Sequence, residues 1–172
     1  MSVPHLSMDH HPTLRHVDRQ AIGEELQQIL VVLIDLSLLG KQAHWNVTGP
    51  HFRSLHLQLD EMVEAWRDDA DRVAERAMAL GVSPDGRAAT VAARSPLTSL
   101  PGDQLADRDV VHALTRLLTD SVGTVRERAA PLEELDPVTA DVLHGVIATL
   151  EEQLWMIRVQ AGPPSGAAGN GR

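Results

Sequence analysis

The stretch IGEELQQILVVLIDLSLLGKQAHW, residues 22–45, decides the fold class of this 172-residue chain. Its apolar residues recur at helical spacing, and its middle is apolar almost all round. This pattern indicates a helix that is buried on more than one face. The most apolar run, residues 29–39, has eleven residues, whereas a membrane-spanning helix needs roughly 20. We therefore expect a buried helix of a globular protein, with Asp18 as its N-cap and its end near Trp45.

Three further stretches of the chain show the same helical periodicity. They cover about residues 51–80, 109–129 and 136–160. The last of them opens with Asp136 as N-cap and a proline at the first helical position, which is a typical helix start. No strand pattern competes with these helices, so the sequence predicts an all-α fold.

The connections between the four helices differ in length. Short turns join the first helix to the second and the third to the fourth, which predicts two antiparallel hairpins. Residues 82–106 form a 25-residue connection rich in Pro, Gly, Ser and Ala, and such a length is unusual in a compact domain unless it crosses the fold. A long crossover of this kind is typical of ferritin-like four-helix bundles. We also expect a short helix near residues 97–105.

The two ends of the chain differ in composition from the bundle, which we place at residues 18–160. Residues 1–17 show no sustained periodicity and are predicted to be a flexible arm. Residues 161–172 are rich in Gly and Pro and are predicted to be a flexible tail. The arm holds four histidines to which the sequence assigns no role: His5, His10, His11 and His16.

Composition excludes several classes of protein. The chain has 15 Lys and Arg against 24 Asp and Glu, a net charge of −9, nine His and no Cys. The absence of Cys excludes a disulfide scaffold, a zinc–thiolate site and thiol catalysis. The acidic excess argues against simple charge attraction to DNA or to anionic lipid. The N-terminus lacks the basic start and apolar run of a secretory signal, so we expect a cytoplasmic protein without membrane contact.

Metal-ligating residue types gather on the second helix and at the end of the first. His44 lies in the last turn of the first helix. His56 and Asp60 are four residues apart on the second helix, and Asp71 and Glu75 repeat that spacing further along. Because each helical residue advances about 100°, these last four side chains share one stripe.

The length of this stripe determines what it can bind. Fifteen residues separate His56 from Asp71, or roughly 22 Å of helix, whereas metal–ligand bonds span only about 2.0–2.6 Å. Two chains could share an ion if their second helices pack antiparallel about a twofold axis, which would give two equivalent sites per dimer. Two His and one carboxylate with open positions suit non-haem Fe(II). The same ligands could equally bind zinc or manganese.

The same residues carry a family resemblance. The segments Lys41-Gln-Ala-His44-Trp45-Asn46, Leu55-His56-x3-Asp60 and Asp71-x3-Glu75-Arg76-Ala77 resemble the Dps family of bacterial mini-ferritins. The offsets from His44, which are 12, 16, 27 and 31 residues, match that family's ferroxidase signature without a gap. Ferritins proper use Glu-x-x-His pairs, and this sequence contains none.

The resemblance implies an activity and an assembly. Dps proteins are hollow dodecamers that oxidise Fe(II), preferentially with hydrogen peroxide rather than oxygen, and store Fe(III) as mineral. The implied enzyme is a ferroxidase that protects the cell and its DNA from oxidative damage. Its iron ligands would be His44, His56 and Asp60 of one subunit with Asp71 and Glu75 of the twofold partner.

Three further residues receive roles from the same resemblance. Trp45 is either an interface packing residue or an electron donor beside the iron site. Asp136 and Asp141 lie where the family lines threefold iron-entry pores, although Asp136 equally serves as a helix cap. Other acidic residues of the second helix are expected on its solvated surface: Glu64, Asp68 and Asp69.

DNA binding is the point at which the sequence departs from many Dps proteins. The family's DNA-binding members commonly use Lys-rich arms, but the single lysine here, Lys41, lies in a helix. Twelve subunits of charge −9 would carry about −108 in total and repel DNA at neutral pH. Arm histidines gain charge below about pH 6.5, which would allow a weak contact there. The alternatives are a nucleoid-compacting DNA-binding protein with a vestigial metal site, and a metal-free helical assembly.

Overall fold

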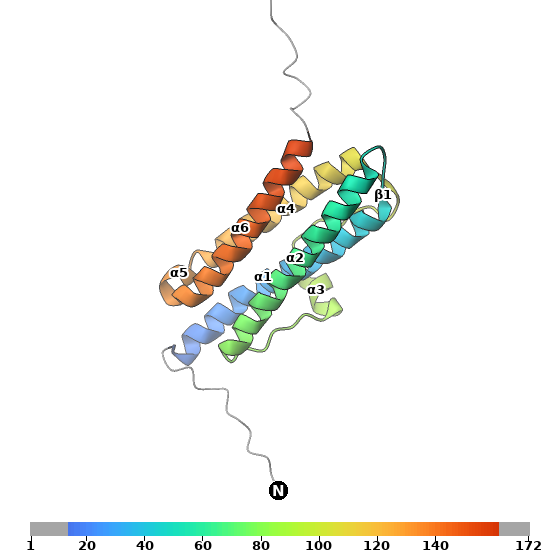
Figure 1. Cartoon of the computed structure of the whole chain (residues 1–172). Coiled ribbons are helices and arrows are strands. Elements are labelled where there is room, and N and C mark those ends of the chain that lie inside the picture. Colours follow the sequence, from blue (N-terminus) through green and yellow to red (C-terminus); the bar gives the residue numbers. More distant parts are fainter. Residues whose placement is uncertain (1–13, 162–172) are drawn as a thin grey trace, which may run out of the picture.

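A computed structural model describes residues 14–161, which form a bundle of four long helices (Figure 1). Helices α1 and α2 make one antiparallel hairpin, and α4 and α6 make the other. The hairpins pack together through α1 against α4 and α2 against α6. This arrangement confirms the predicted all-α bundle. The four helices are α1 (His16–Asn46), α2 (Phe52–Ala79), α4 (Asp107–Ala129) and α6 (Pro137–Gln160).

Helix α1 is the most enclosed element, as its apolar middle predicts. It contacts α2 on one side, α4 on another and the short helix α3 (Ala88–Arg94) on a third. The core between the hairpins is built almost wholly from Leu, Ile and Val side chains. The one large aromatic residue in it is Trp66 of α2, which is completely buried and donates its indole N–H to Gln153 of α6. No helix within residues 14–161 is long and apolar enough to cross a membrane.

The crossover runs from the end of α2 to the start of α4 along the outside of α1 (Figure 1). The expected helix at residues 97–105 is wrong, because α3 forms earlier, at Ala88–Arg94. Asp85 explains this position, since its carboxylate accepts hydrogen bonds from Arg87 N at 3.1 Å and Thr90 Oγ1 at 2.8 Å. Pro101 interrupts the later stretch and Pro96 directly precedes it, so a helix is disfavoured there.

The crossover is also attached to α1 by a pair of reciprocal hydrogen bonds. Gln27 Nε2 donates to the backbone oxygen of Asp85 at 2.9 Å, and Asp85 N donates to Gln27 Oε1 at 2.7 Å. About two helical turns further along α1, the carboxylate of Asp35 accepts a hydrogen bond from the hydroxyl of Ser95. These contacts hold the 25-residue connection against the helix that it passes.

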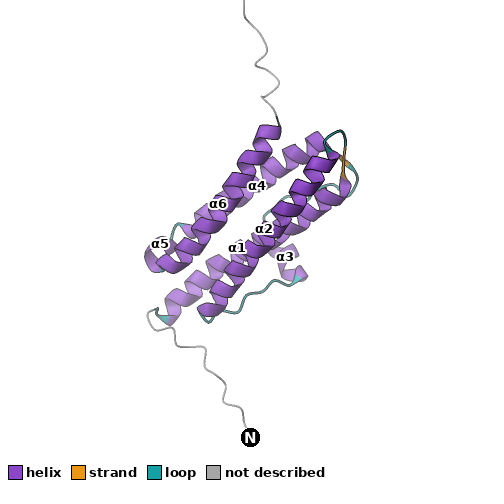
Figure 2. Ribbon diagram, viewed as in Figure 1, coloured by secondary structure: helices purple, strands orange, loops and turns teal. Residues whose placement is uncertain are grey.

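Two short strands were not expected from the sequence. Strands β1 (Val47–Thr48) and β2 (Leu105–Ala106) pair in parallel, with Val47 opposite Leu105 (Figure 2). They join the α1–α2 turn to the last residues of the crossover. Each strand is two residues long, which is too short to produce a period-two pattern.

Two helix starts differ from the predictions by two to three residues, whereas α6 begins at Pro137 after Asp136, as predicted. Helix α1 begins at His16, so Asp18 is not its N-cap. Asp18 instead lies in the first turn and forms a bidentate ion pair with Arg15, with both contacts at 2.7 Å. Helix α4 likewise begins at Asp107 rather than at residue 109. A four-residue helix, α5 (Leu132–Leu135), lies between α4 and α6.

The contact between α1 and α2 depends on a glycine, and this gives a stability prediction. A Cβ atom at Gly40 would lie 2.5 Å from Trp66 Cζ3 and 2.7 Å from Val63 Cγ2. We expect Gly40→Ala to lower the free energy of unfolding by about 1–3 kcal/mol through overpacking, measured by urea denaturation at one fixed protein concentration.

Gly145→Ala provides the matched control. Gly145 also lies inside a long helix, but nothing stands within 4 Å of the position of an added Cβ. This substitution should raise the free energy of unfolding by about 0.5–1 kcal/mol, because alanine favours a helix over glycine. Equal effects of the two substitutions would refute the packing argument.

Candidate metal centre

His44, His56 and Asp60 come together beside the α1–α2 turn. One potential ligand atom from each lies within 4.8 Å of the others. His44 is in the last turn of α1. His56 and Asp60 lie one helical turn apart near the start of α2. Within residues 14–161, no other group of three His, Asp or Glu side chains comes this close.

The two histidine rings fix each other's orientation. His44 Nδ1 lies 2.8 Å from the backbone oxygen of His56, and His56 Nδ1 lies 3.0 Å from the backbone oxygen of His44. The rings stack with centroids 3.7 Å apart and an interplanar angle of 21°. Because a carbonyl oxygen only accepts hydrogen bonds, each Nδ1 must carry a proton. Each Nε2 of the neutral ring is therefore left with a lone pair for a metal.

Lys41 is a member of this site that the sequence analysis missed. Its Nζ lies 2.5 Å from Asp60 Oδ1, and the same oxygen is 3.4 Å from His44 Nδ1. The hydrogen bond from Lys41 holds the pKa of the Asp60 carboxyl below its usual value, against the partial loss of hydration. The sequence already indicated that Lys41 lies beside the site, because Lys41 precedes His44 by three residues and so shares its helix face.

Asp71 and Glu75 lie further along α2, and both are exposed. Neither belongs to the cluster formed by His44, His56 and Asp60. Each chain therefore presents two separate sets of potential ligands, one beside the α1–α2 turn and one further along α2. A site that uses all five residues requires a second subunit, so the sharing of the site remains a prediction.

Trp45 lies next to His44 and is 68% exposed. Lys41 Nζ stands 5.8 Å from the centroid of its ring, which is within the range of a cation–π contact. A tryptophan this exposed packs little against its own chain. Both roles predicted for Trp45, interface packing and electron donation, remain predictions.

The two predicted pore residues have different surroundings. Asp136 is the residue before α6 and is buried, with its carboxylate bonded to Arg76 of α2 and to Thr139 Oγ1. Asp141 is exposed one turn further along α6. Within one chain, Asp136 thus serves to join α2 to α6, whereas Asp141 remains free to face a pore.

Asp69 was expected on the solvated surface of α2, and this is wrong. Its side chain is only 2% exposed, with Oδ1 3.2 Å from Arg72 Nη1. Burial raises the pKa of the Asp69 carboxyl, although the Arg72 charge opposes the shift. Asp69 follows the buried Trp66 by three residues and precedes the buried Val73 by four, so helical periodicity already placed it on the inner face.

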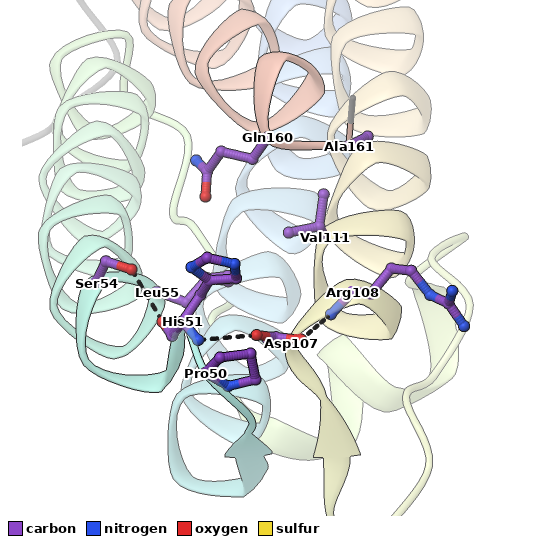
Figure 3. A pocket seen from close by; sticks show the side chains of 9 residues that line it. All are labelled: Pro50, His51, Ser54, Leu55, Asp107, Arg108, Val111, Gln160 and Ala161. Atoms are coloured by element: carbon purple, nitrogen blue, oxygen red, sulfur yellow. Dashed lines mark hydrogen bonds between the residues drawn. The ribbon is translucent and has the colours of Figure 1, made fainter. Parts of the chain in front are cut away.

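A pocket of about 570 Å³ opens at the same end of the bundle (Figure 3). His51, Arg108 and Gln160 line its rim. At its base, the Asp107 carboxylate accepts hydrogen bonds from His51 N at 2.9 Å and Arg108 N at 2.8 Å. These bonds join the start of α2 to the start of α4. The pocket contains none of the predicted metal ligands, and the three histidine–carboxylate residues lie outside it.

Comparison with known proteins places this chain and its fold in a family. The ferritin-like domain family matches residues 23–162. DpsA14 from Streptomyces coelicolor superposes with a TM-score of 0.86 at 31% identity, over 92% of this chain and 95% of that one. The chain belongs to the ferritin-like family, and its relatives place it among the Dps proteins of that family.

Two relatives from Deinococcus radiodurans show the extent of the similarity. The DNA protection during starvation protein 2 is 38% identical over 135 residues, and protein 1 is 35% identical over 153 residues. These alignments cover 78% and 86% of this chain. The chain spans 56% of the length of the first relative and 72% of the second.

The Asp136 contacts predict a pH-dependent contribution to stability. Burial raises the pKa of Asp136, but hydrogen bonds from Thr139 and Arg76 outweigh it and leave the pKa below its usual value. A lowered pKa stabilises the folded state above about pH 4, and this stabilisation is lost as the pH falls through the folded-state pKa. Asp136→Asn should therefore cost about 3 kcal/mol at pH 7, and this cost should begin to fall as the pH drops below about 4.

Urea denaturation at pH 7, 5 and 3 measures this difference. Asp141→Asn is the matched control, because Asp141 lies on the same helix but is exposed. Its free energy of unfolding should follow that of the unmodified protein at each pH. A pH-independent effect of Asp136→Asn would contradict the charge-based argument.

Proposed function

We propose that the protein is a ferroxidase of the Dps type, which oxidises Fe(II) and stores Fe(III) inside a shell of identical subunits. The observation that carries this proposal is the His44–His56 pair, whose two Nδ1–H groups are bonded to carbonyl oxygens. Each Nε2 is thereby left with a lone pair for a metal, and one nitrogen of each ring lies within 4.8 Å of an Asp60 carboxylate oxygen. This donor set occurs in a chain of the Dps family, at positions that match the family signature.

The nature of the donors favours iron as the substrate metal. Two imidazoles and one carboxylate with open positions suit Fe(II). Added carboxylates stabilise Fe(III), and the exposed Asp71 and Glu75 are available on α2 for that purpose. Zinc or manganese with the same ligands is the alternative, and oxidation kinetics separate the cases because zinc has no redox chemistry.

The proposed site is shared between two subunits related by a twofold axis. Antiparallel pairing of two α2 helices would bring the His44, His56 and Asp60 end of one chain to the Asp71 and Glu75 end of the other. Two Fe(II) ions held together would supply two electrons and, with two protons, reduce one hydrogen peroxide to two water molecules. Paired transfer avoids release of a hydroxyl radical, which a single electron would produce.

The residues around the ligands have distinct tasks in this proposal. Lys41 neutralises Asp60 while the site is empty, so arriving Fe(II) must displace one cation from the carboxylate. The exposed Asp141 of α6 is proposed to line an iron-entry pore. The net charge of −9 per chain favours accumulation of Fe(II) at the shell.

Mixing of two inactive variants tests both the ligands and their sharing. His56→Ala and Asp71→Ala should each reduce peroxide-dependent Fe(II) oxidation by at least about tenfold, followed by absorbance of Fe(III). When the two variants are dissociated and reassembled together, some sites regain all five ligands. Activity should then return to a substantial fraction of that of the unmodified protein.

Glu61→Ala is the matched control, because Glu61 is an exposed carboxylate of the same helix outside both ligand sets. Its oxidation rate should be unchanged. If the variants of His56 and Asp71 oxidise iron normally, the site assignment is wrong. If each variant alone is inactive and the mixture is inactive as well, the ligand assignment is supported but the sharing of the site between subunits is refuted.

DNA binding is the alternative function, and the charge of the chain argues against it at neutral pH. We expect no retardation of duplex DNA in a gel-shift assay at pH 8 and moderate salt, because a shell of negative subunits repels phosphate. A weak shift is expected near pH 5.5, where arm histidines are charged. A variant with His5, His10 and His11 changed to Asn should abolish the acidic shift. Retardation at pH 8 would support the DNA-compacting alternative.

A further inference from the structure

The metal centre is bordered by a third aromatic ring. Phe52 is the first residue of α2 and precedes His56 by one helical turn. Its ring centroid lies 5.0 Å from that of His56, at an interplanar angle of 35°. Since His44 stacks on the same imidazole at 3.7 Å, the three rings form a row in the order Phe52, His56, His44.

This row restricts the imidazole of His56 on three sides. Phe52 and His44 contact the ring, and the backbone oxygen of His44 accepts the Nδ1 proton at 3.0 Å. The edge that carries Nε2 is left for a ligand. The contacts with Phe52 and His44 oppose a half-turn of the ring about its Cβ–Cγ bond, which would exchange its two nitrogens.

Core packing within the chain does not account for Phe52. It is the single phenylalanine of the sequence, and its side chain is 43% exposed although the core is otherwise aliphatic. The aromatic ring that Phe52 contacts is the imidazole of His56. The ring of Phe52 thus contacts a candidate metal ligand, and Phe52 is not among the residues of the hydrophobic core.

We propose that Phe52 is a positioning residue that fixes the His56 imidazole in its metal-binding orientation and so raises the affinity of the site for a divalent cation. This rests on the proposed function, in which His56 is a metal ligand. A ligand that is already oriented loses less conformational freedom when the metal arrives. Contacts that orient metal-binding histidines typically contribute 10–100-fold to affinity.

Cobalt(II) binding to the assembled, metal-free protein tests the proposal without any oxidation step. Co(II) absorbs visible light, and its spectrum reports the nitrogen and oxygen atoms around it. Phe52→Leu keeps an apolar side chain but removes the ring, and should raise the Kd for Co(II) by about tenfold. Phe52→Tyr keeps the ring and should restore the Kd to within about twofold of the unmodified protein.

Leu57→Ala controls for effects of surface and assembly. Leu57 lies on the same helix and is 46% exposed, close to the value for Phe52, but it lines a separate groove with Met62 and Met156. Its Kd for Co(II) should be unchanged. Light scattering on the same samples measures the size of each assembly. If Phe52→Leu assembles poorly, Phe52→Met provides a second variant that lacks the aromatic ring.

The outcomes separate this inference from the proposed function. If His56→Ala abolishes Co(II) binding while Phe52→Leu and Phe52→Met bind as tightly as the unmodified protein, the positioning role is overturned and the metal centre stands. If Phe52→Tyr is as weak as Phe52→Leu, the ring is not what orients His56. If His56→Ala binds Co(II) normally, the metal centre itself is refuted.

Discussion

Helices α1 and α2 approach each other closely at Gly40, where the ring of Trp66 occupies the space that a side chain would fill. The rest of the site depends on this approach, because it sets how far apart the two helices are at the turn. There, His44 and His56 each reach the other's backbone oxygen. The close packing of Gly40 against Trp66 thus lies one helical turn before His44, at the end of α1 that carries the histidine contacts.

The second hairpin is joined to the first through polar contacts along α2 and α6. Trp66 meets Gln153 inside the core, and Arg76 reaches Asp136 and Thr139 nearer the far end. Arg76 directly follows Glu75. Because successive helical residues differ by about 100°, fixing Arg76 toward α6 turns Glu75 to the outside, where a partner subunit has access to it.

Helical spacing was enough to predict the four long helices, the crossover and the grouping of His44 with His56 and Asp60. These features depend on contacts within a helix or across one turn. The β1–β2 pairing depends on a partner far along the chain, Leu105 for Val47, so local patterns did not reveal it. The position of α3 follows from the local bonds of Asp85 to Arg87 and Thr90, a signal that the sequence analysis did not use. The burial of Asp69 was predictable from its spacing to Trp66, but its charge was given more weight than its position.

The crossover has a consequence for the order of folding. Contacts within each hairpin join residues that are near in sequence, so closing them costs little chain entropy. Docking of one hairpin on the other must close the long connection, and the β1–β2 pair and the Asp107 bonds form only then. The two hairpins are therefore natural cooperative units in the sense of native-state hydrogen exchange. The proposed metal ligands His44, His56 and Asp60 all lie within the first unit.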